Sequence, residues 1–408
     1  MDEDHIAPDS PFQETSIPPS VKRLGWVSFF TDFASEMVYP VVPLFLVALG
    51  APAMALGFIE GGAEAIVSLL KGVTGWHCDR MGKRVVYVRL GYGLAALSKP
   101  IMALASSWGL VLFSRSLDRV GKGLRSTARD VMIADAIHPG IAGKAFGFHR
   151  AMDTAGAIAG VLASALFLWL LPGQFRAIFL LAAIPGALAV WLTFRLKDTP
   201  RPAGETCPNP RGSLFAALRR PGLPPAYWRT LAPLLVFALA NSSDAFLLLR
   251  AKNLGLGDSG VILAYALFNV TYALAAYPLG ALSDRFGRWK MILAGWTIYA
   301  GVYLGLSLTS EAGPVWWLFP VYGFYMALTE GIGKALVSRQ APAEKRGVAM
   351  GIFQMAVGLV MLVSSVLAGV LWDMIGPGAP FLFGGLAALA AILSACLMAP
   401  WKEDRQVS

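Results

Sequence analysis

Charged side chains are scarce in this chain. Asp, Glu, Lys and Arg make up 14% of its 408 residues, whereas an ordinary soluble domain carries about 25%. Hydrophobic residues make up 56%, and the mean hydropathy is +0.60. The few charges gather between apolar runs of about 20 residues or more, the length that a membrane-spanning helix requires. The composition therefore excludes a soluble domain and predicts an all-α membrane protein.

Cysteine and histidine are also rare. The three cysteines have neither the pairing nor the spacing of a disulfide framework or a metal site, and the four histidines show no metal-ligand spacing. The chain lacks a glycine-rich loop that cradles phosphates, which excludes ATP hydrolysis. Neither a nucleophile–base pair nor a metal constellation is visible. We therefore expect no metal, no cofactor and no enzymatic activity.

Acidic residues are outnumbered by basic ones, and the net charge is +9. In a membrane protein such an excess indicates cytoplasmic loops rather than nucleic-acid binding, because Lys and Arg gather on the cytoplasmic side. The loops at 50–54 and 106–109 carry no charge, so they belong to the opposite side. We expect both termini to be cytoplasmic. The residues that indicate the cytoplasmic side are Lys22, Arg23, Arg80, Lys83, Arg84, Arg285, Arg288, Lys290, Lys345, Arg346, Lys402 and Arg405.

Apolar runs long enough to span a bilayer occur twelve times, six on each side of a polar stretch. The polar stretch, 196–230, contains many prolines and six basic residues, and it is predicted to be a cytoplasmic linker. We expect six-helix bundles over 21–195 and 231–401, a disordered cytoplasmic tail over 1–20 and a short one over 402–408. The approximate spans are 25–49, 53–77, 85–105, 109–133, 143–171, 175–195, 231–250, 257–282, 290–310, 314–338, 346–371 and 378–400.

A short basic turn occurs once in each half of the chain. The first covers residues 75–84 (GWHCDRMGKR) and the second covers residues 280–288 (GALSDRFGR), each between two apolar runs. Gly82 and Gly287 permit a turn with positive φ, which other residues adopt with difficulty. Because the two copies occupy matching places, the chain contains an internal duplication.

Twelve spans, a duplication of six plus six, a basic linker and this turn together resemble the major facilitator superfamily. The resemblance covers essentially the whole chain beyond the N-terminal tail. It implies two pseudo-symmetric six-helix bundles that the turns hold together as a cytoplasmic gate. Asp79 and Asp284 can bond the N-terminal amides of a helix or a basic partner across the bundle interface. The residues assigned to the gate are Gly75, Asp79, Arg80, Gly82, Lys83, Arg84, Gly280, Asp284, Arg285, Gly287 and Arg288.

Charged residues also occur inside the predicted spans, where each costs roughly 2.5–3.5 kcal/mol or more. Asp32 and Glu36 lie four residues apart, as do Glu60 and Glu64, so each pair projects from one face of its helix. These faces are expected to point inward, because lipid would reject them. The candidates for binding protons or substrate are Asp32, Glu36, Glu60, Glu64, Arg115, Asp118, Arg119, Lys122, Arg125, His149, Asp153 and Asp244.

Three interpretations of these charges remain open. Carboxylates in a low-dielectric site can carry protons, and Asp32, Glu36 and Asp153 are the leading candidates. Alternatively, the four bases of the fourth span can bind an anionic substrate through charge-assisted hydrogen bonds. In the third interpretation acids and bases neutralise one another in buried pairs, which suits Asp118 in particular.

Two helices are expected to shape a cavity. In the first span Pro40 and Pro43 follow the acids, and proline lets a helix bend around a cavity. The run 241–244 (NSSD) occupies about the corresponding place in the seventh span and is expected to face the acids. In the fifth span, Gly156 and Gly160 resemble a glycine-rich motif of proton-coupled drug exporters, although Val161 stands where that motif has proline.

These patterns favour a secondary active transporter that works by alternating access. We expect proton-coupled efflux of a small organic solute by a monomer in the bacterial inner membrane, with protons as the coupling ion. The alternative is a uniporter or exchanger of an organic anion bound by the bases of the fourth span. A membrane-embedded enzyme or a sensor is a further alternative, for which neither a catalytic constellation nor a signalling domain is visible.

Overall fold

The computed structural model describes residues 17–81, 84–137, 142–198, 222–342 and 345–398. These residues form helices joined by short connections, and they contain no β-strand. The prediction of an all-α protein is therefore confirmed. Most of the predicted N-terminal tail, most of the linker and the whole of the C-terminal tail lie outside the described residues.

The helices of the first half follow the first six predicted spans within a few residues. Two of them, α1 and α2, share the first span. They are α1 (Pro19–Val38), α2 (Val41–Ala48), α3 (Ala53–Met81), α4 (Arg84–Ala103), α5 (Trp108–Asp135), α6 (Ala142–Leu170) and α7 (Phe175–Thr193).

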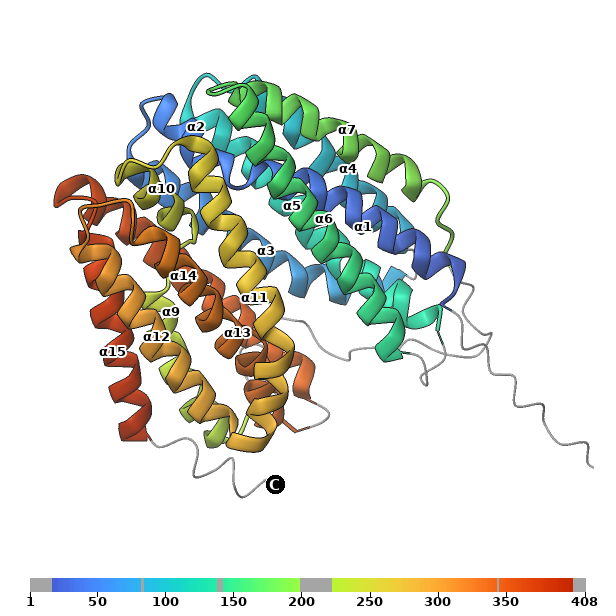
Figure 1. Ribbon diagram of the computed structural model, residues 1–408. Coiled ribbons are helices and arrows are strands. Elements are labelled where there is room, and N and C mark those ends of the chain that lie inside the picture. The colour runs from blue at the N-terminus through green and yellow to red at the C-terminus, as the bar shows by residue number, and fades with distance from the viewer. Residues whose placement is uncertain (1–16, 82–83, 138–141, 199–221, 343–344, 399–408) are drawn as a thin grey trace, which may run out of the picture.

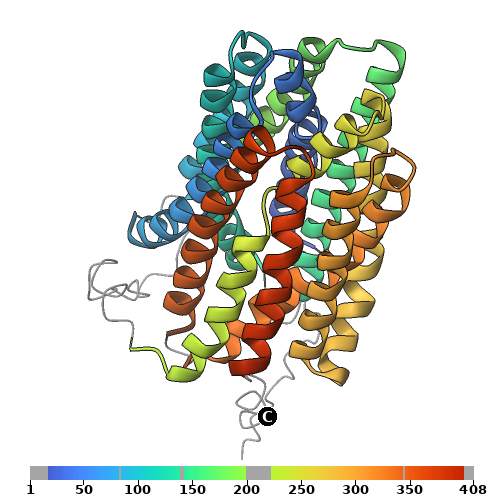
Figure 2. The ribbon, with the colours of Figure 1, turned by 90° about the vertical axis from the view of Figure 1, so that its left-hand side faces the viewer.

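The second half repeats this arrangement after the linker, and its first span is again divided between two helices. The two halves form separate groups of ribbons in Figure 1, and Figure 2 shows their long helices running along a common direction. The helices are α9 (Pro225–Ala240), α10 (Ala245–Asn253), α11 (Asp258–Phe286), α12 (Arg288–Leu308), α13 (Val315–Arg339), α14 (Arg346–Met374) and α15 (Ala379–Met398).

Nine helical segments of the described chain are long and apolar enough to cross a membrane. The helices α4, α5 and α13 occupy the three other predicted spans. Their charged or polar side chains lower their hydropathy, and α5 carries the largest group of them. Lys99 of α4 and Arg115 of α5 are each 3% exposed, so these charges face protein rather than lipid, as a charge at membrane depth requires.

The break in the seventh span is stabilised by contacts from other helices. The chain leaves helical geometry at Asn241, between α9 and α10. The freed carbonyl of Ala240 accepts a hydrogen bond from the Tyr299 hydroxyl at 2.7 Å, and the amide of Ser243 donates to Ser365 Oγ at 3.1 Å. Such partners make irregular backbone tolerable inside a membrane. The corresponding break between α1 and α2 falls at Tyr39 and Pro40, where proline was expected to bend the helix.

The two halves meet mainly along α3 with α14 and α6 with α11. On α3, a methyl group at Gly57 would overlap the main chain at Ser365, and one at Gly61 would lie 3.0 Å from Leu362 Cα. Small residues let membrane helices approach this closely without a hydrophobic driving force. The α3–α14 contact is therefore tight at the level of these glycines.

The carboxylate of Asp373 joins the two halves at one end of the α3–α14 contact. Asp373 of α14 accepts hydrogen bonds from the amides of Ala53 at 2.9 Å and Met54 at 2.8 Å. These amides begin α3, where a helix has unsatisfied donors and a partial positive charge. Asp373 thus caps a helix of the opposite half.

Candidate functional site

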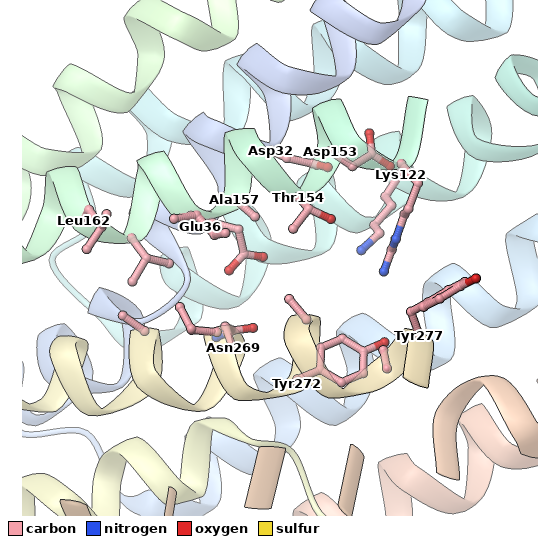
Figure 3. Close-up of a pocket in the computed structure, with 17 residues that line it drawn as sticks. Asp32, Glu36, Lys122, Asp153, Thr154, Ala157, Leu162, Asn269, Tyr272 and Tyr277 are labelled. Atoms are coloured by element: carbon pink, nitrogen blue, oxygen red, sulfur yellow. The ribbon is translucent and has the colours of Figure 1, made fainter. Parts of the chain in front are cut away.

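A cavity of about 490 Å³ lies between the two halves, bounded by α1, α5 and α6 on one side and α11 on the other. Pockets for drug-sized ligands are usually about 300–1,000 Å³. Figure 3 shows the cavity between the two helices α6 and α11. The charged residues that line it are Asp32, Glu36, Lys122, Arg150 and Asp153.

Glu36 connects the two halves across this cavity. Its carboxylate accepts a hydrogen bond from the Tyr265 hydroxyl of α11 at 3.1 Å, and the Tyr265 ring lies 5.6 Å from the ring of Tyr39. Among the residues that the structure describes, neither Glu36 nor its neighbour Asp32 has a Lys or Arg partner within salt-bridge distance. These two carboxylates are therefore available to a solute or a proton.

Asp153 of α6 lies in the same cavity and has unused bonding capacity. Its Oδ2 lies 3.6 Å from His149 Nδ1, one helical turn earlier. Within the described residues, Asp153 Oδ1 and His149 Nε2 are buried without a hydrogen-bond partner. The structure thus brings Asp32, Glu36 and Asp153 together in the cavity lining. His149 contacts Asp153 but does not line the cavity.

A second group of charges is fully paired and lies at the junction of α3, α4 and α5. Glu60 accepts two hydrogen bonds from Arg115, at 2.9 and 2.8 Å. Asp118 lies 2.6 Å from the Lys99 ammonium and 3.9 Å from an Arg115 nitrogen. All four side chains are nearly inaccessible to solvent. Such bidentate and charge-assisted bonds satisfy groups that would otherwise be costly to bury.

The other three candidate bases of α5, Arg119, Lys122 and Arg125, differ in their surroundings. Lys122 is exposed to the cavity. Arg125 is buried with its guanidinium 4.6 Å from the centre of the Tyr92 ring, and Arg119 is half-buried. Glu64 is half-buried on α3 and lies outside the cavity lining. Of the four bases that the anion-binding interpretation invoked, Lys122 lines the cavity, whereas Arg115 is occupied by Glu60.

Asp244 lies among aromatic side chains of the second half. Its Oδ1 accepts a hydrogen bond from the Tyr322 hydroxyl at 2.7 Å. Tyr322 belongs to a cluster of rings with Tyr299, Tyr303 and Tyr325, whose neighbouring ring centres lie 4.0–6.3 Å apart. Asp244 and the cavity carboxylates thus come from different halves and have different neighbours.

Two positions of the predicted gate, Gly287 and Arg84, are well described. Gly287 has φ 91°, the left-handed conformation that favours glycine, and it separates α11 from α12. Arg84 forms an ion pair with Asp135, while Asp198 accepts hydrogen bonds from the amides of Arg84 and Val85 at 2.9 and 3.0 Å. The carboxylate that caps α4 is therefore Asp198, from the predicted linker.

The remaining gate residues are described only in part. Gly280 and Arg285 lie in the last two turns of α11, and Arg288 begins α12. Gly75, Asp79 and Arg80 lie in α3. The side chains of Asp79, Arg80 and Asp284, and the whole of Gly82 and Lys83, lie outside the described residues, so their predicted contacts stay predictions.

Several cavity residues were not among the predicted site residues. Arg150 of α6 and Asn269, Tyr272 and Tyr277 of α11 line the cavity, and Tyr265 bonds to Glu36. Arg150 had a recognisable signal, since it is a charge inside a predicted span. A tyrosine in a membrane helix is more often an interfacial or packing residue, so sequence alone does not distinguish Tyr265 or Tyr272.

The chain resembles known proteins over most of its length. The sequence profile of the Major Facilitator Superfamily matches residues 24–251 and again residues 245–407. An uncharacterized MFS-type transporter of Methanocaldococcus jannaschii is 34% identical over 383 residues, which is 92% of this chain and 94% of that protein. The multidrug resistance protein MdtH of Citrobacter koseri is 24% identical over 346 residues, which is 83% of this chain and 83% of that protein.

The fold also matches solved structures. A bacterial homologue of the human lysosomal transporter Spinster, in an inward-facing and unoccupied conformation, superposes with a TM-score of 0.71 and 17% sequence identity. The match covers 93% of this chain and 95% of that chain. At this identity the likeness shows the shared fold alone. With the profile matching both halves, the chain belongs to the major facilitator superfamily and is an integral membrane transporter of small molecules.

Proposed function

We propose that this transporter exports a small organic solute in exchange for protons, by alternating access of one central cavity. The observation that carries the proposal is the group of Asp32, Glu36 and Asp153, three carboxylates that line the cavity. An acid that is partly removed from water and not neutralised by a base can change its protonation state as the cavity changes its access. The paired acids Glu60 and Asp118 are assigned a structural role instead.

The contact between Glu36 and Tyr265 supports a coupling between protonation and conformation. The hydrogen bond joins α1 of one half to α11 of the other. An ionised carboxylate accepts a stronger hydrogen bond than a neutral one. Protonation of Glu36 therefore weakens a contact between the halves, so that a proton biases the equilibrium between two arrangements.

The proposal includes a location and an orientation. The basic residues of the loops favour cytoplasmic termini and a bacterial inner membrane. The turns at 75–84 and 280–288 then lie on the cytoplasmic side, where we assign them the role of a gate. We propose that one chain forms a complete transport unit, because the cavity is lined by both halves of the same chain.

Export is favoured over uptake by two likenesses. The glycines of α6 pack closely on α1, since a methyl group at Gly156 or Gly160 would overlap the main chain at Phe29 or Phe33. Close packing of this kind is what small residues spaced by four provide in any pair of membrane helices, so the support for export is the resemblance of this stretch to the exporters' glycine-rich motif. In addition, a relative of similar length is named a multidrug resistance protein.

One observation favours the alternative, a uniporter or exchanger of an organic anion. Lys122 and Arg150 also line the cavity, and both can donate charge-assisted hydrogen bonds to an anion. In this alternative the bases hold the solute, and no net proton movement accompanies transport.

Transport in proteoliposomes distinguishes the two functions. The lumen is made more acidic than the bath, and ethidium and p-aminohippurate serve as cationic and anionic probes within a wider panel of solutes. A proton-coupled exporter inserted with its cytoplasmic side outward accumulates its solute in the acidic lumen, and nigericin abolishes the accumulation. Solute movement that is the same with and without the pH gradient would contradict proton coupling.

A further inference from the structure

The cavity between α6 and α11 reaches the lipid-facing surface of the protein. Leu162 of α6 and Tyr277 of α11 line it, yet they are 49% and 86% exposed. Val270, which also lines it, is 37% exposed. Beside them, Leu166 of α6 and Leu274 of α11 lie outside the lining and are 57% and 74% exposed, which marks the adjoining surface of both helices as facing lipid. The cavity therefore has a lateral mouth between α6 and α11.

The cavity is charged towards one end and apolar towards the other. Along α6, Arg150 and Asp153 come before Ala157, Val161 and Leu162, and the distance from the first to the last of these is about 18 Å at 1.5 Å per residue. Figure 3 shows Lys122 and Asp153 near one end of the cavity and Leu162 near the other. Since α6 begins on the predicted cytoplasmic side, the charged end lies nearer the cytoplasm.

This polarity has the orientation of a lipid in the cytoplasmic leaflet. Such a molecule places its head group at the cytoplasmic interface and its tail towards the middle of the bilayer. The charged end offers both signs, because Lys122 and Arg150 face the same space as Asp32 and Asp153. Bases of this kind bind phosphate, and carboxylates bind an ammonium group.

The size of the cavity favours one acyl chain over two. Its volume of about 490 Å³ lies within the range of pockets that hold drug-sized ligands. A tail can extend through the lateral mouth into lipid, so only the head group and the first part of the chain need to be enclosed. A water-soluble cation needs neither the two bases nor an apolar opening to the bilayer.

We propose that the solute is a single-chain phospholipid with a zwitterionic head group, which enters from the cytoplasmic leaflet between α6 and α11. Lys122 and Arg150 hold its phosphate, Asp32 and Asp153 face its ammonium group, and the apolar stretch of α6 contacts its tail. This inference names the solute of the proposed exporter and rests on that function for the direction of movement.

The test uses the full-length protein in liposomes that contain tail-labelled lysophosphatidylethanolamine. Albumin extracts the probe from the outer leaflet only, so the extractable fraction reports movement between leaflets. Ala273→Trp places an indole in the lateral mouth, because Ala273 lines the cavity and is exposed. Leu274→Trp is the matched control. Leu274 is the next residue along α11, its side chain is 74% exposed, and it lies outside the cavity lining.

We expect the native protein and Leu274→Trp to move the probe, and Ala273→Trp to move it no faster than protein-free liposomes. The double variant Lys122→Gln/Arg150→Gln should lower the rate about tenfold or more, because each lost charge-assisted bond weakens head-group binding. Size-exclusion profiles and melting temperatures that match the native protein show that each variant is folded.

Two results would overturn the inference. One is the absence of probe movement by the folded native protein, even if another solute of the panel moves with the pH gradient. The other is equal movement by Ala273→Trp and Leu274→Trp. Probe movement that depends on the lateral mouth but ignores the pH gradient would instead contradict the proton-coupled function and support the lipid as solute.

Discussion

Two groups of carboxylates lie within the first half of the chain and differ in their partners. Glu60 and Asp118 are held by Arg115 and Lys99 at 2.6–2.9 Å, away from the cavity lining. Asp32 and Glu36 line the cavity and, within the described residues, have no such base. We infer from this difference that the paired acids hold helices together, whereas the acids without a base serve transport.

The paired group should dominate stability. Arg115→Met removes the base from Glu60 and leaves a buried carboxylate without its partner, which is expected to cost about 3–5 kcal/mol. Thermal unfolding of the purified protein in detergent measures the loss. Lys122→Met is the matched control, because Lys122 is exposed, and it should leave the melting temperature close to that of the native protein.

Removing both partners sharpens this test. Glu60→Gln together with Arg115→Met leaves no isolated charge at the Glu60 position, so part of the lost stability should return. If Arg115→Met melts like the native protein, the pair does not stabilise the fold and the distinction between the two groups of acids is wrong.

The Glu36–Tyr265 contact should have a smaller effect on stability. Tyr265→Phe keeps the ring near Tyr39 and removes only the hydroxyl that bonds to Glu36 at 3.1 Å. A hydrogen bond to a charged group contributes about 1.5–3 kcal/mol to stability. Because Glu36 is only half-buried, we expect a loss near the lower end of this range. The measurement is the free energy of unfolding of Tyr265→Phe in the native and Glu36→Leu backgrounds. An equal loss in both backgrounds would show that the two side chains are not coupled.

The positions of the spans could be predicted because they depend on local composition. Apolar runs of sufficient length and the loops between them were enough to place every span within a few residues. The breaks within the first and seventh spans were harder to predict. Pro40 predicted the first one, but Pro185 and Pro278 lie inside intact helices, and the break at Asn241 depends on Tyr299 and Ser365 from distant parts of the chain.

The sequence favoured a base beside Asp118, but the identity of that base and the pairing of Glu60 could not be predicted, because they depend on how three helices meet. A methyl group at Gly91 of α4 would lie 2.6 Å from the carbonyl oxygen of Gly121 on α5. This close approach brings Lys99 onto Asp118. From the sequence, Glu60 was one of the candidates for binding protons or substrate. The structure places its partner, Arg115, on another helix 55 residues away.

The most direct test of the division between the two groups is proton release on solute binding. The unbuffered, purified protein is mixed with a solute that it transports, and a pH-sensitive dye reports the protons released. We predict release from the native protein and its loss in the double variant Asp32→Asn/Glu36→Gln, with the fold retained. Undiminished release from that variant would contradict the assignment of these cavity carboxylates as the proton carriers.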